Sequence, residues 1–343
     1  MKRRIALLAA VTACAAAARA GPLHMEALPP KTRWCIHLDM AGFRGTGLGR
    51  YLTDEVRDPN LADIVRRFRE QCAFHPVRDV ADLTLYGTDY RPGSGVMLIR
   101  GKLDSESVLR TLRATREVRA RKHGGYELHE WTVPERNIRR VTCFYRPSLT
   151  VVGSRRDAVA RALDVLERKR GSAGATAAPA PVMEKGVFLR GWAAECRGKL
   201  GGFSDSILLA SAHQLVFALG EEGERMVGEL RIETEKEEEA GHLHNILLAL
   251  LALAILRDDE NPAGAALASR TKASCDGTTV RLRLNAPTET LRKALEPPMD
   301  GSPQPGTPLF KILPDPASSA EPSGRPGGPV PVERPEGPGT EPP

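Results

Sequence analysis

Two short runs hold histidine and carboxylate side chains that could carry acid–base chemistry. His37 and Asp39 alternate within an apolar stretch, so a strand there would place both on one face. His129 and Glu130 form the second run. General acid–base catalysis uses groups of these types, which makes these four the residues to inspect for an exported hydrolase. Residues of this kind in a strand also simply face solvent, and that is what we expect here.

The other catalytic and nucleotide-binding patterns are incomplete. Ser269-x-x-Lys272 matches the nucleophile motif of penicillin-interacting enzymes, but the companion Ser-x-Asn and Lys-Thr-Gly elements are missing. The glycine-rich run 42–49 follows an expected strand. Its spacing does not fit a dinucleotide fingerprint, so we interpret it as a turn that needs positive φ. The sequence therefore predicts no enzyme, no catalytic residue and no bound cofactor.

Metal ligation has little support in the sequence. His242 and His244 follow the acidic run 237–239, and imidazole and carboxylate are suitable ligands, but no third ligand has a fixed spacing. Acidic residues are also favourable at a helix N-terminus. Five cysteines follow residue 20, far apart and without a Cys-x-x-Cys pair: Cys35, Cys72, Cys143, Cys196 and Cys275. We predict no metal site, and the disulfide pairing stays open.

The first twenty residues predict an export signal. Three basic residues at 2–4 precede the apolar run 5–18, and Ala18 and Ala20 are small residues where a signal peptidase reads the chain. The run is too short for a permanent span, which takes about 20 apolar residues. The four residues ending at Cys14 resemble a lipobox, in which Cys14 would be lipidated. Either reading makes the protein extracytoplasmic, periplasmic or secreted.

Charge is unevenly distributed along the chain. The net charge of +6 includes four positive residues of the leader, so the remainder is close to neutral. Aromatic residues are only 5%, which together with the location argues against a nucleic-acid partner. Residues 109–170 hold 16 Arg and Lys against 7 Asp and Glu. This basic face predicts contact with an anionic envelope polymer or lipid headgroups, and the oligomeric state stays open.

The stretch 243–256 is the most apolar part of the chain, with eleven uninterrupted apolar residues from Ile246. As a helix, these residues cover about 17 Å, well short of a hydrocarbon core of about 30 Å. We therefore expect no transmembrane helix in the mature chain. A helix that is apolar on all sides is normally buried at the centre of a core, and we expect this one to be. Insertion into a membrane or a partner is the alternative.

Two segments, 22–170 and 182–296, show the same order of elements on either side of a linker at 171–181. The first predicts strands at 34–38, 79–86, 95–100, 126–133 and 140–153, and helices at 61–72, 105–118 and 155–169. The second predicts strands at 186–189, 213–219, 225–235 and 279–284, and helices at 193–210, 240–255 and from 288. We expect an α+β fold: two similar halves of antiparallel strand pairs with helices packed on one face.

Local signals fix some boundaries. Asp104 is a good N-cap for the helix at 105, and Ser154 with Asp157 has the spacing of a capping box. The tail, 297–343, carries 15 of the 27 prolines, so we expect it to be disordered, with 309–313 as the part most suited to dock.

The organisation resembles a group of exported bacterial proteins of uncharacterised function. The resemblance lies in Leu28-Pro-x-x-Thr-x-Trp34 before the first strand, in Leu85-Tyr86-Gly87, and in the strand that ends Gly-Lys-Leu-Asp104. It implies an exported, duplicated α+β body and no functional residues. Our leading hypothesis is a non-enzymatic binding or structural protein of the cell envelope. The alternatives are a hydrolase with a site invisible in sequence and a carrier of an apolar ligand such as lipid.

Overall fold

The computed structural model describes residues 23–54, 75, 78–91, 93–133, 138–173, 179–180, 182–183, 185–199, 211–258 and 261–295. The predicted leader 1–20, the helix 61–72 and the tail 297–343 lie outside these residues. The elements of the first half are η2 (Met25–Ala27), β1 (Trp34–Asp39), α2 (Met40–Gly45), α3 (Gly47–Asp54), β2 (Val80–Gly87), β3 (Val96–Gly101), α5 (Ser105–Thr115), β4 (Arg119–His123), β5 (Tyr126–Val133), β6 (Ile138–Arg146), β7 (Leu149–Gly153) and α6 (Arg156–Leu166).

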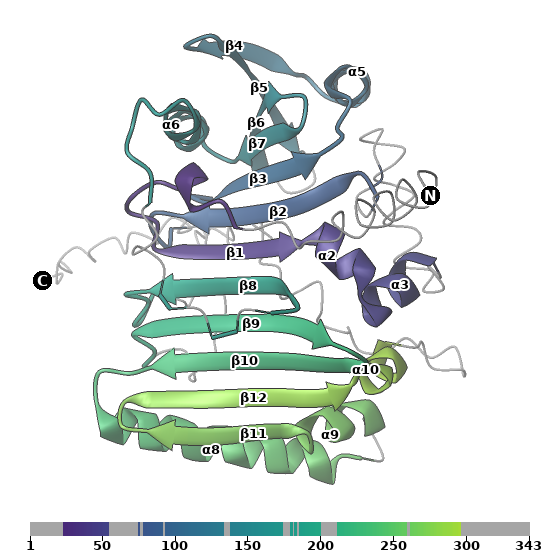
Figure 1. The fold of residues 1–343 in the computed structure, drawn as a ribbon. Helices are drawn as coiled ribbons and strands as arrows, with labels where there is room; N and C mark the ends of the chain where they lie inside the picture. Colours follow the sequence, from purple (N-terminus) through teal and green to yellow (C-terminus); the bar gives the residue numbers. More distant parts are fainter. Residues whose placement is uncertain are drawn as a thin grey trace, which may run out of the picture.

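The second half continues the same sheet (Figure 1). Its elements are β8 (Val187–Ala194), β9 (Gln214–Glu222), β10 (Arg225–Glu233), α8 (Glu237–Leu256), α9 (Pro262–Ala268), β11 (Thr271–Asp276), β12 (Thr279–Pro287) and α10 (Thr288–Leu295). Twelve strands in the order β11-β12-β10-β9-β8-β1-β2-β3-β7-β6-β5-β4 form one sheet, and the paired strands are antiparallel. The predicted α+β class with antiparallel pairing is confirmed.

The strand order shows the similarity of the halves. In the first, β1, β2 and β3 form a meander, a helix follows, and β7 returns beside β3. In the second, β8, β9 and β10 form the same meander, α8 follows, and β12 returns beside β10. The pair β4 and β5 extends the first half beyond this common pattern.

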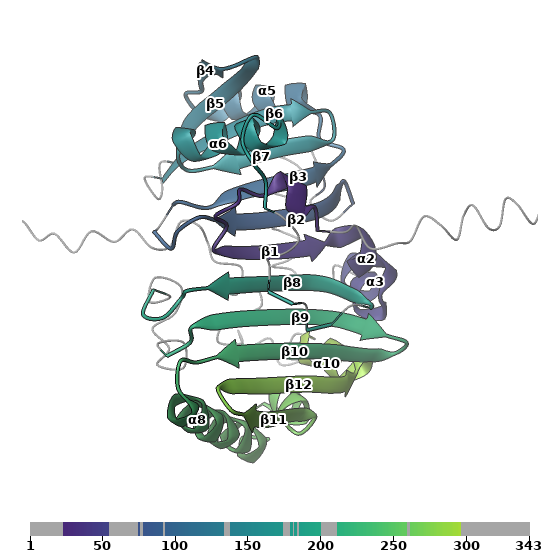
Figure 2. The ribbon, with the colours of Figure 1, turned by 60° about the vertical axis from the view of Figure 1, so that its left-hand side comes forward.

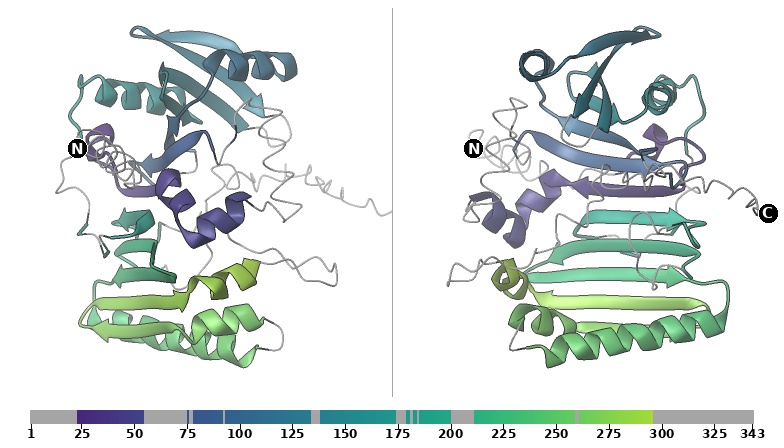
Figure 3. Two further views of the ribbon diagram at one scale, coloured as in Figure 1. Left: turned by 45° about the vertical axis from the view of Figure 1, so that its right-hand side comes forward. Right: turned by 180° about the vertical axis from the view of Figure 1, so that it is seen from behind.

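The halves are joined through β1 and β8, which pair antiparallel from Trp34 and Ala193 onward (Figure 3). A side chain reinforces this junction, because Glu221 at the end of β9 accepts hydrogen bonds from the backbone N–H groups of Gly47 and Leu48 at 2.6 and 3.3 Å. It thereby caps the first turn of α3. Leu48 also packs with Phe188 and Met226 in a small core shared by both halves.

Helices cover both faces of the continuous sheet, whereas we expected them on one face. Alternation along the strands puts Cys35, Leu98 and Val151 on one face, where α6 packs in the largest core cluster. The opposite face carries Ile232 and Val280, against which α8 packs. In the lower part of the molecule α9 lies beside α8 and α10 lies beside α9, whereas α5 and α6 stand on either side of the upper strands (Figure 1).

Most of the expected strands and helices in the described residues are present, and the predicted N-cap is confirmed. The Asp104 carboxylate accepts from the N–H groups of Glu106 and Ser107 at 3.1 and 3.3 Å. The expected capping box is wrong: α6 begins at Arg156, Arg155 is its N-cap without a side-chain bond, and Ser154 Oγ accepts from Arg140 instead.

Three other expectations are wrong. The run 42–49 is helical, in α2 and α3, and none of its glycines has positive φ. Gly49 serves close packing instead, since a Cβ there would lie 1.7 Å from the Phe43 carbonyl oxygen. The helix expected at 193–210 does not begin at 193, because β8 extends to Ala194, where it still pairs with β9. The helix expected at 105–118 ends at Thr115, and Arg119 belongs to a strand.

Described residues of the expected linker 171–181 contact the body. The Ala173 N–H donates to the Leu28 carbonyl at 2.7 Å, and Ala173 is buried. The Ala180 carbonyl accepts from Arg231 at 3.1 Å. Both described parts of the segment are therefore held against the body of the protein.

Candidate functional site

The most unusual surface belongs to α8. Its large apolar side chains are exposed along the C-terminal half of the helix: Ile246, Leu248, Leu250, Leu253, Ile255 and Leu256. Five are 41–47% exposed and Leu256 is 83% exposed. The expectation that this helix is buried in a core is therefore wrong. A contiguous apolar patch of this kind marks a surface for lipid or for a partner. We call these six residues the apolar face.

The position of α8 explains its exposure. The helix runs along the outer strands β11 and β12 at one end of the sheet, with α9 beside it (Figure 2). Only Ala240, Leu243 and Leu247 are buried against the body. The sheet ends at β11, and among the described residues no further layer covers the outer side of the helix. α8 is apolar on all sides, but only one of its sides packs against the protein. Its other side chains are therefore exposed.

The acidic run 237–239 has a structural role at the start of α8. Arg197 contacts Glu239 and Glu235, with N–O distances of 2.8 and 2.7 Å, and its hydrogen bond holds the pKa of the Glu239 carboxyl below its usual value. Negative charge in this first turn also suits the helix dipole. Within the described part of the chain, no three His, Cys, Asp or Glu side chains are grouped to hold a metal, His242 and His244 included.

A second surface lies at the opposite end of the sheet, around β4. A cleft of about 530 Å³ opens between the strands β4 to β6 and the first turn of α6, and its residues are mainly charged: Arg119, Arg121, Glu130, Arg139, Ser154, Arg155, Arg156 and Asp157. We call it the arginine cleft. A neighbouring hollow of about 580 Å³ shares Arg119, Glu130 and Arg139 with it and adds Arg116.

Strand register gathers the arginines of this cleft. Arg119 is directly opposite Glu130 in the β4–β5 pairing, and Arg139 on β6 contacts the same carboxylate. Arg156, in the first turn of α6, lies 4.0 Å from Glu130. Glu130 is 7% exposed, and its Oε1 atom accepts no hydrogen bond in the described structure. The buried carboxylate therefore forms the floor beneath the guanidinium groups.

The rim of the cleft has one further acid, Asp157. Arg155 and Arg161 hydrogen-bond its carboxylate at 2.8 to 3.1 Å and hold its pKa well below the usual range. Glu117 forms an exposed ion pair with Arg119 at 2.8 Å. Exposed pairs of this kind contribute about 0–1 kcal/mol, so they leave the arginines available to a competing anion.

The residues considered for acid–base chemistry are buried, contrary to the expectation that they face solvent. His37 is 2% exposed and shares a hydrogen bond of 2.9 Å with Thr84 Oγ1. Asp39 is 1% exposed and caps α2, since its Oδ1 accepts from the Gly42 N–H at 2.8 Å. Alternation places His37 and Asp39 on one face, as predicted.

The structure adds a carboxylate that the sequence analysis missed. Asp82 on β2 is directly opposite Asp39, with Arg100 next to it on β3. Burial, and then the charge of Asp39, raise the pKa of Asp82 to about 7. The sequence could have indicated Asp82, because it is an aspartate inside an apolar strand. Its proximity to Asp39, however, follows only from the β1–β2 register.

The two histidine runs do not converge. His37 and Asp39 lie on β1, whereas His129 and Glu130 lie on β5, with β2, β3, β7 and β6 between them. His129 and Glu130 are neighbours in one strand and point to opposite faces. Burial lowers the pKa of His129, whereas Glu130 lines a cleft.

Four of the cysteines can be placed. Cys35, Cys143 and Cys196 are free and buried, and Cys275 is free and exposed; Cys72 lies outside the described residues. Burial raises the pKa of the Cys143 thiol to about 11. A raised pKa disfavours the nucleophilic thiolate, so Cys143 acts as a small core residue.

Comparison with known proteins gives no family: no family model matches the chain, and no curated protein matches it. Solved structures with similarity include crystal form III of TP0453, with a TM-score of 0.48 and 9% identity over 80% of this chain and 98% of that one. Crystal forms I and IV of TP0453 give TM-scores of 0.44, with 10% and 11% identity, covering 80% of this chain and 97% and 96% of those chains.

Proposed function

We propose that this chain is an exported, non-enzymatic protein of the cell envelope that binds the surface of a lipid bilayer through α8. The observation that carries this proposal is the exposure of six large apolar side chains on one helix. The expected leader at 1–20 supports it, because export brings the protein next to envelope membranes.

Lipid fits the apolar face better than a protein partner does. Protein interfaces combine an apolar centre with polar rim residues that form hydrogen bonds. From Ile246 to Leu256 α8 offers no polar side chain for such contacts. Acyl chains require none, and the backbone of a helix is already satisfied by its own hydrogen bonds.

The geometry favours an interfacial position over a span. α8 has 20 residues and is long and apolar enough to cross a membrane by length and composition, with 17% of its most apolar window buried. Its first turns, however, are held by Arg197 and by the packing of Ala240 and Leu243. The free apolar run of eleven residues is about 17 Å long, which suits a helix lying within one leaflet.

The expected gain in free energy is sufficient for reversible binding. Full burial of a large aliphatic side chain contributes about 1.5–3 kcal/mol. Five residues of the apolar face are 41–47% exposed and Leu256 is 83% exposed, so inserting all six yields roughly 4–9 kcal/mol before the costs of association.

Vesicle flotation tests the proposal. The processed, exported chain is mixed with phosphatidylcholine vesicles, with and without phosphatidylglycerol, and compared with the triple variant Leu248→Gln, Leu250→Gln, Leu253→Gln. We expect the wild type to float with both kinds of vesicle and the glutamine variant to remain unbound. A triple Leu→Met variant at the same positions keeps the surface apolar and should float.

Either of two results would contradict the proposal: a wild-type chain that does not float, or a glutamine variant that floats equally well. A wild-type dimer dispersed by the glutamine substitutions, without vesicle binding, would assign the apolar face to a second copy instead. Thermal unfolding of all three proteins checks that the exposed substitutions leave the fold intact.

Export has its own test in the mass of the mature N-terminus. A chain that begins at Gly21 shows simple secretion, and a lipidated Cys14 shows a lipid anchor; both agree with the proposal. A mature chain that retains residues 1–20 without modification contradicts it.

A further inference from the structure

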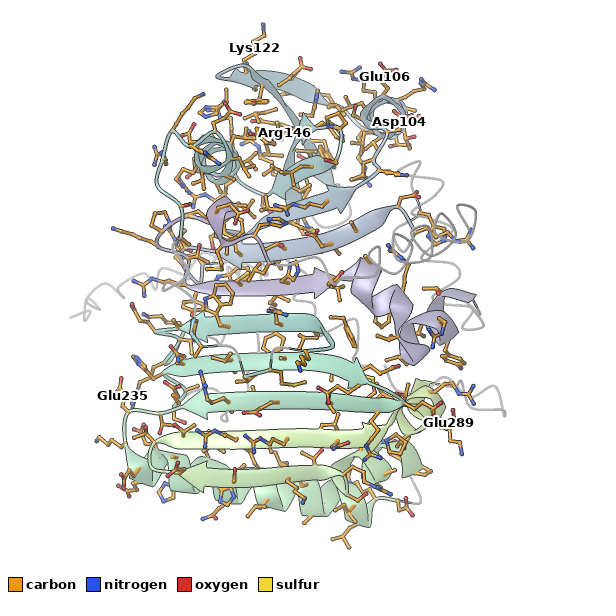
Figure 4. The ribbon with its side chains drawn as sticks, in the orientation of Figure 1. Asp104, Glu106, Lys122, Arg146, Glu235 and Glu289 are labelled. Carbon is orange, nitrogen blue, oxygen red and sulfur yellow. The ribbon has the colours of Figure 1, made fainter. Side chains whose placement is uncertain are left out.

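The arginine cleft is far from the apolar face. β4 and β11 are the two edge strands of the sheet, and α8 lies along β11. Strands are spaced by about 4.8 Å, so the eleven steps between these edges amount to about 50 Å measured along the sheet. A protein held to lipid by α8 therefore presents the cleft to the aqueous compartment. Figure 4 labels Lys122 on β4 at one end and Glu235, just before α8, towards the other.

The cleft has excess positive charge. It is lined by five arginines and two acids, which leaves a net charge of +3 from its lining residues. Asp157 is engaged by Arg155, and Glu130 by Arg139. In the described structure no ion pair engages Arg121, and Arg119 pairs with the exposed Glu117 while also feeling the charge of Glu130.

Protection of the edge strand explains only part of this charge. Exposed edge strands commonly carry Lys or Arg, which discourage pairing with other chains. Lys122 fits that role, because alternation turns it to the face opposite Arg119 and Arg121. Arg119 and Arg121 line the cleft instead, next to arginines contributed by β6 and α6. Guanidinium groups gathered from three elements repel one another, and Glu130 and Asp157 offset only two of the five positive charges.

The donors of the cleft suit phosphate. Guanidinium groups form paired hydrogen bonds with phosphate oxygens. The first turn of α6 borders the same cleft, and its N-cap, Arg155, makes no side-chain cap bond, so backbone N–H groups and the helix dipole add to the attraction. A net charge of +3 and about 530 Å³ of space accommodate more than one phosphate group.

We propose that the arginine cleft binds a ligand with clustered phosphate groups in the aqueous part of the envelope. The ligand lies near the edge of the sheet opposite the one that α8 follows. Two phosphate sources share this chemistry, a soluble phosphorylated molecule and a lipid headgroup, and the distance from α8 favours the soluble one. Phosphate binding by the cleft does not depend on the function proposed for α8, whereas the choice of a soluble source rests on it.

Calorimetry with inorganic tripolyphosphate tests the site on the full processed chain. The double variant Arg119→Gln, Arg121→Gln removes two cleft charges from exposed positions. The control Arg110→Gln, Lys122→Gln removes two exposed charges from α5 and from the other face of β4. We expect saturable binding by the wild type, weakened about tenfold or more in the cleft variant and by less than about twofold in the control. The wild-type affinity should also fall as salt is raised.

Three results would overturn the proposal. The first is a wild type without saturable binding. The second is an equal loss in the control, which would make net charge the cause. The third is a cleft variant that loses flotation with phosphatidylglycerol vesicles while no protein binds tripolyphosphate, which would assign the cleft to lipid headgroups. Unchanged thermal unfolding of both variants shows that a loss of binding is not a loss of fold.

Discussion

The middle of the sheet buries polar side chains, whereas its two ends expose large side chains. In the middle, β1 and β2 bury His37, Asp39, Asp82 and Thr84, which are 1–6% exposed. At one end α8 exposes leucine and isoleucine, and at the other β4 exposes arginine. A central strand has a neighbouring strand on each edge and packed residues on each face. An element at the end of the sheet lacks a neighbour on one side. Position in the sheet, more than residue type, therefore decides burial in this molecule.

The largest expected difference between middle and end is in core packing. Leu98 on β3 is 2% exposed, and Leu250 on α8 is 45% exposed. Leu98→Ala should lower the free energy of unfolding by about 2–4 kcal/mol, because it leaves a cavity among packed neighbours. Leu250→Ala removes the same atoms from a half-solvated site and should cost less than about 1 kcal/mol. Chemical denaturation of both variants measures the difference, and equal losses would contradict the comparison.

A smaller effect is expected where the middle of the sheet buries polar groups. Thr84→Val keeps the shape of the side chain but removes the hydroxyl that is hydrogen-bonded to His37. We expect a loss of about 1–3 kcal/mol, because His37 Nδ1 then loses that partner while buried. The matched substitution Thr115→Val, at an exposed position of α5, should change stability by less than about 0.5 kcal/mol. Denaturation curves that coincide for the two variants would show that the buried hydrogen bond between Thr84 and His37 does not stabilise the fold.

Sequence patterns were sufficient where the cause of a structure is local. Asp104 caps α5 as predicted, because an N-cap depends on residues two and three positions away. Strand alternation likewise placed His37 and Asp39 on one face.

The candidate sites depend on distant partners, and the sequence alone could not define them. The basic content of 109–170 was visible, but the arginine cleft depends on the register that sets Arg119 opposite Glu130 and on α6 approaching β6. The burial of α8 depends on what covers its outer side, and hydropathy does not report that. For the same reason the partner of Asp82 stayed hidden until β1 and β2 were paired.

A third prediction concerns pH and Asp82. The pKa of Asp82 is about 7 in the folded chain, and an aspartate in an unfolded chain has a pKa of about 3.9. Between these values the folded state binds a proton that the unfolded state has lost, so the contribution of Asp82 to stability falls as pH rises from about 4 to about 7. Asp82→Asn should flatten the pH dependence of the unfolding free energy in this window.

The slope assigned to Asp82 can be separated from the other carboxylates. Hydrogen bonds from arginines lower the pKa values of Asp89 and Asp157, so their contributions are lost only as pH falls below about 4. Asp89→Asn is therefore the matched control and should leave the slope between about pH 4 and pH 7 unchanged. Burial lowers the pKa of His129, so His129 adds a rise in stability with pH in part of this window, and the test is the difference between the wild type and Asp82→Asn. An Asp82→Asn variant with the same slope as the wild type would contradict the role given to Asp82.

The smallest effect is expected at the exposed end of the sheet. Arg121 lies on β4 with its side chain exposed, and none of the described residues forms an ion pair with it. Arg121→Gln should therefore change the free energy of unfolding by less than about 0.5 kcal/mol in low salt. If five clustered guanidinium groups repel one another in the unliganded cleft, the change will be a slight stabilisation that disappears as salt screens the charges. A destabilisation that is independent of salt would show instead that Arg121 supports the fold, and the arginine end of the sheet would then behave like its middle.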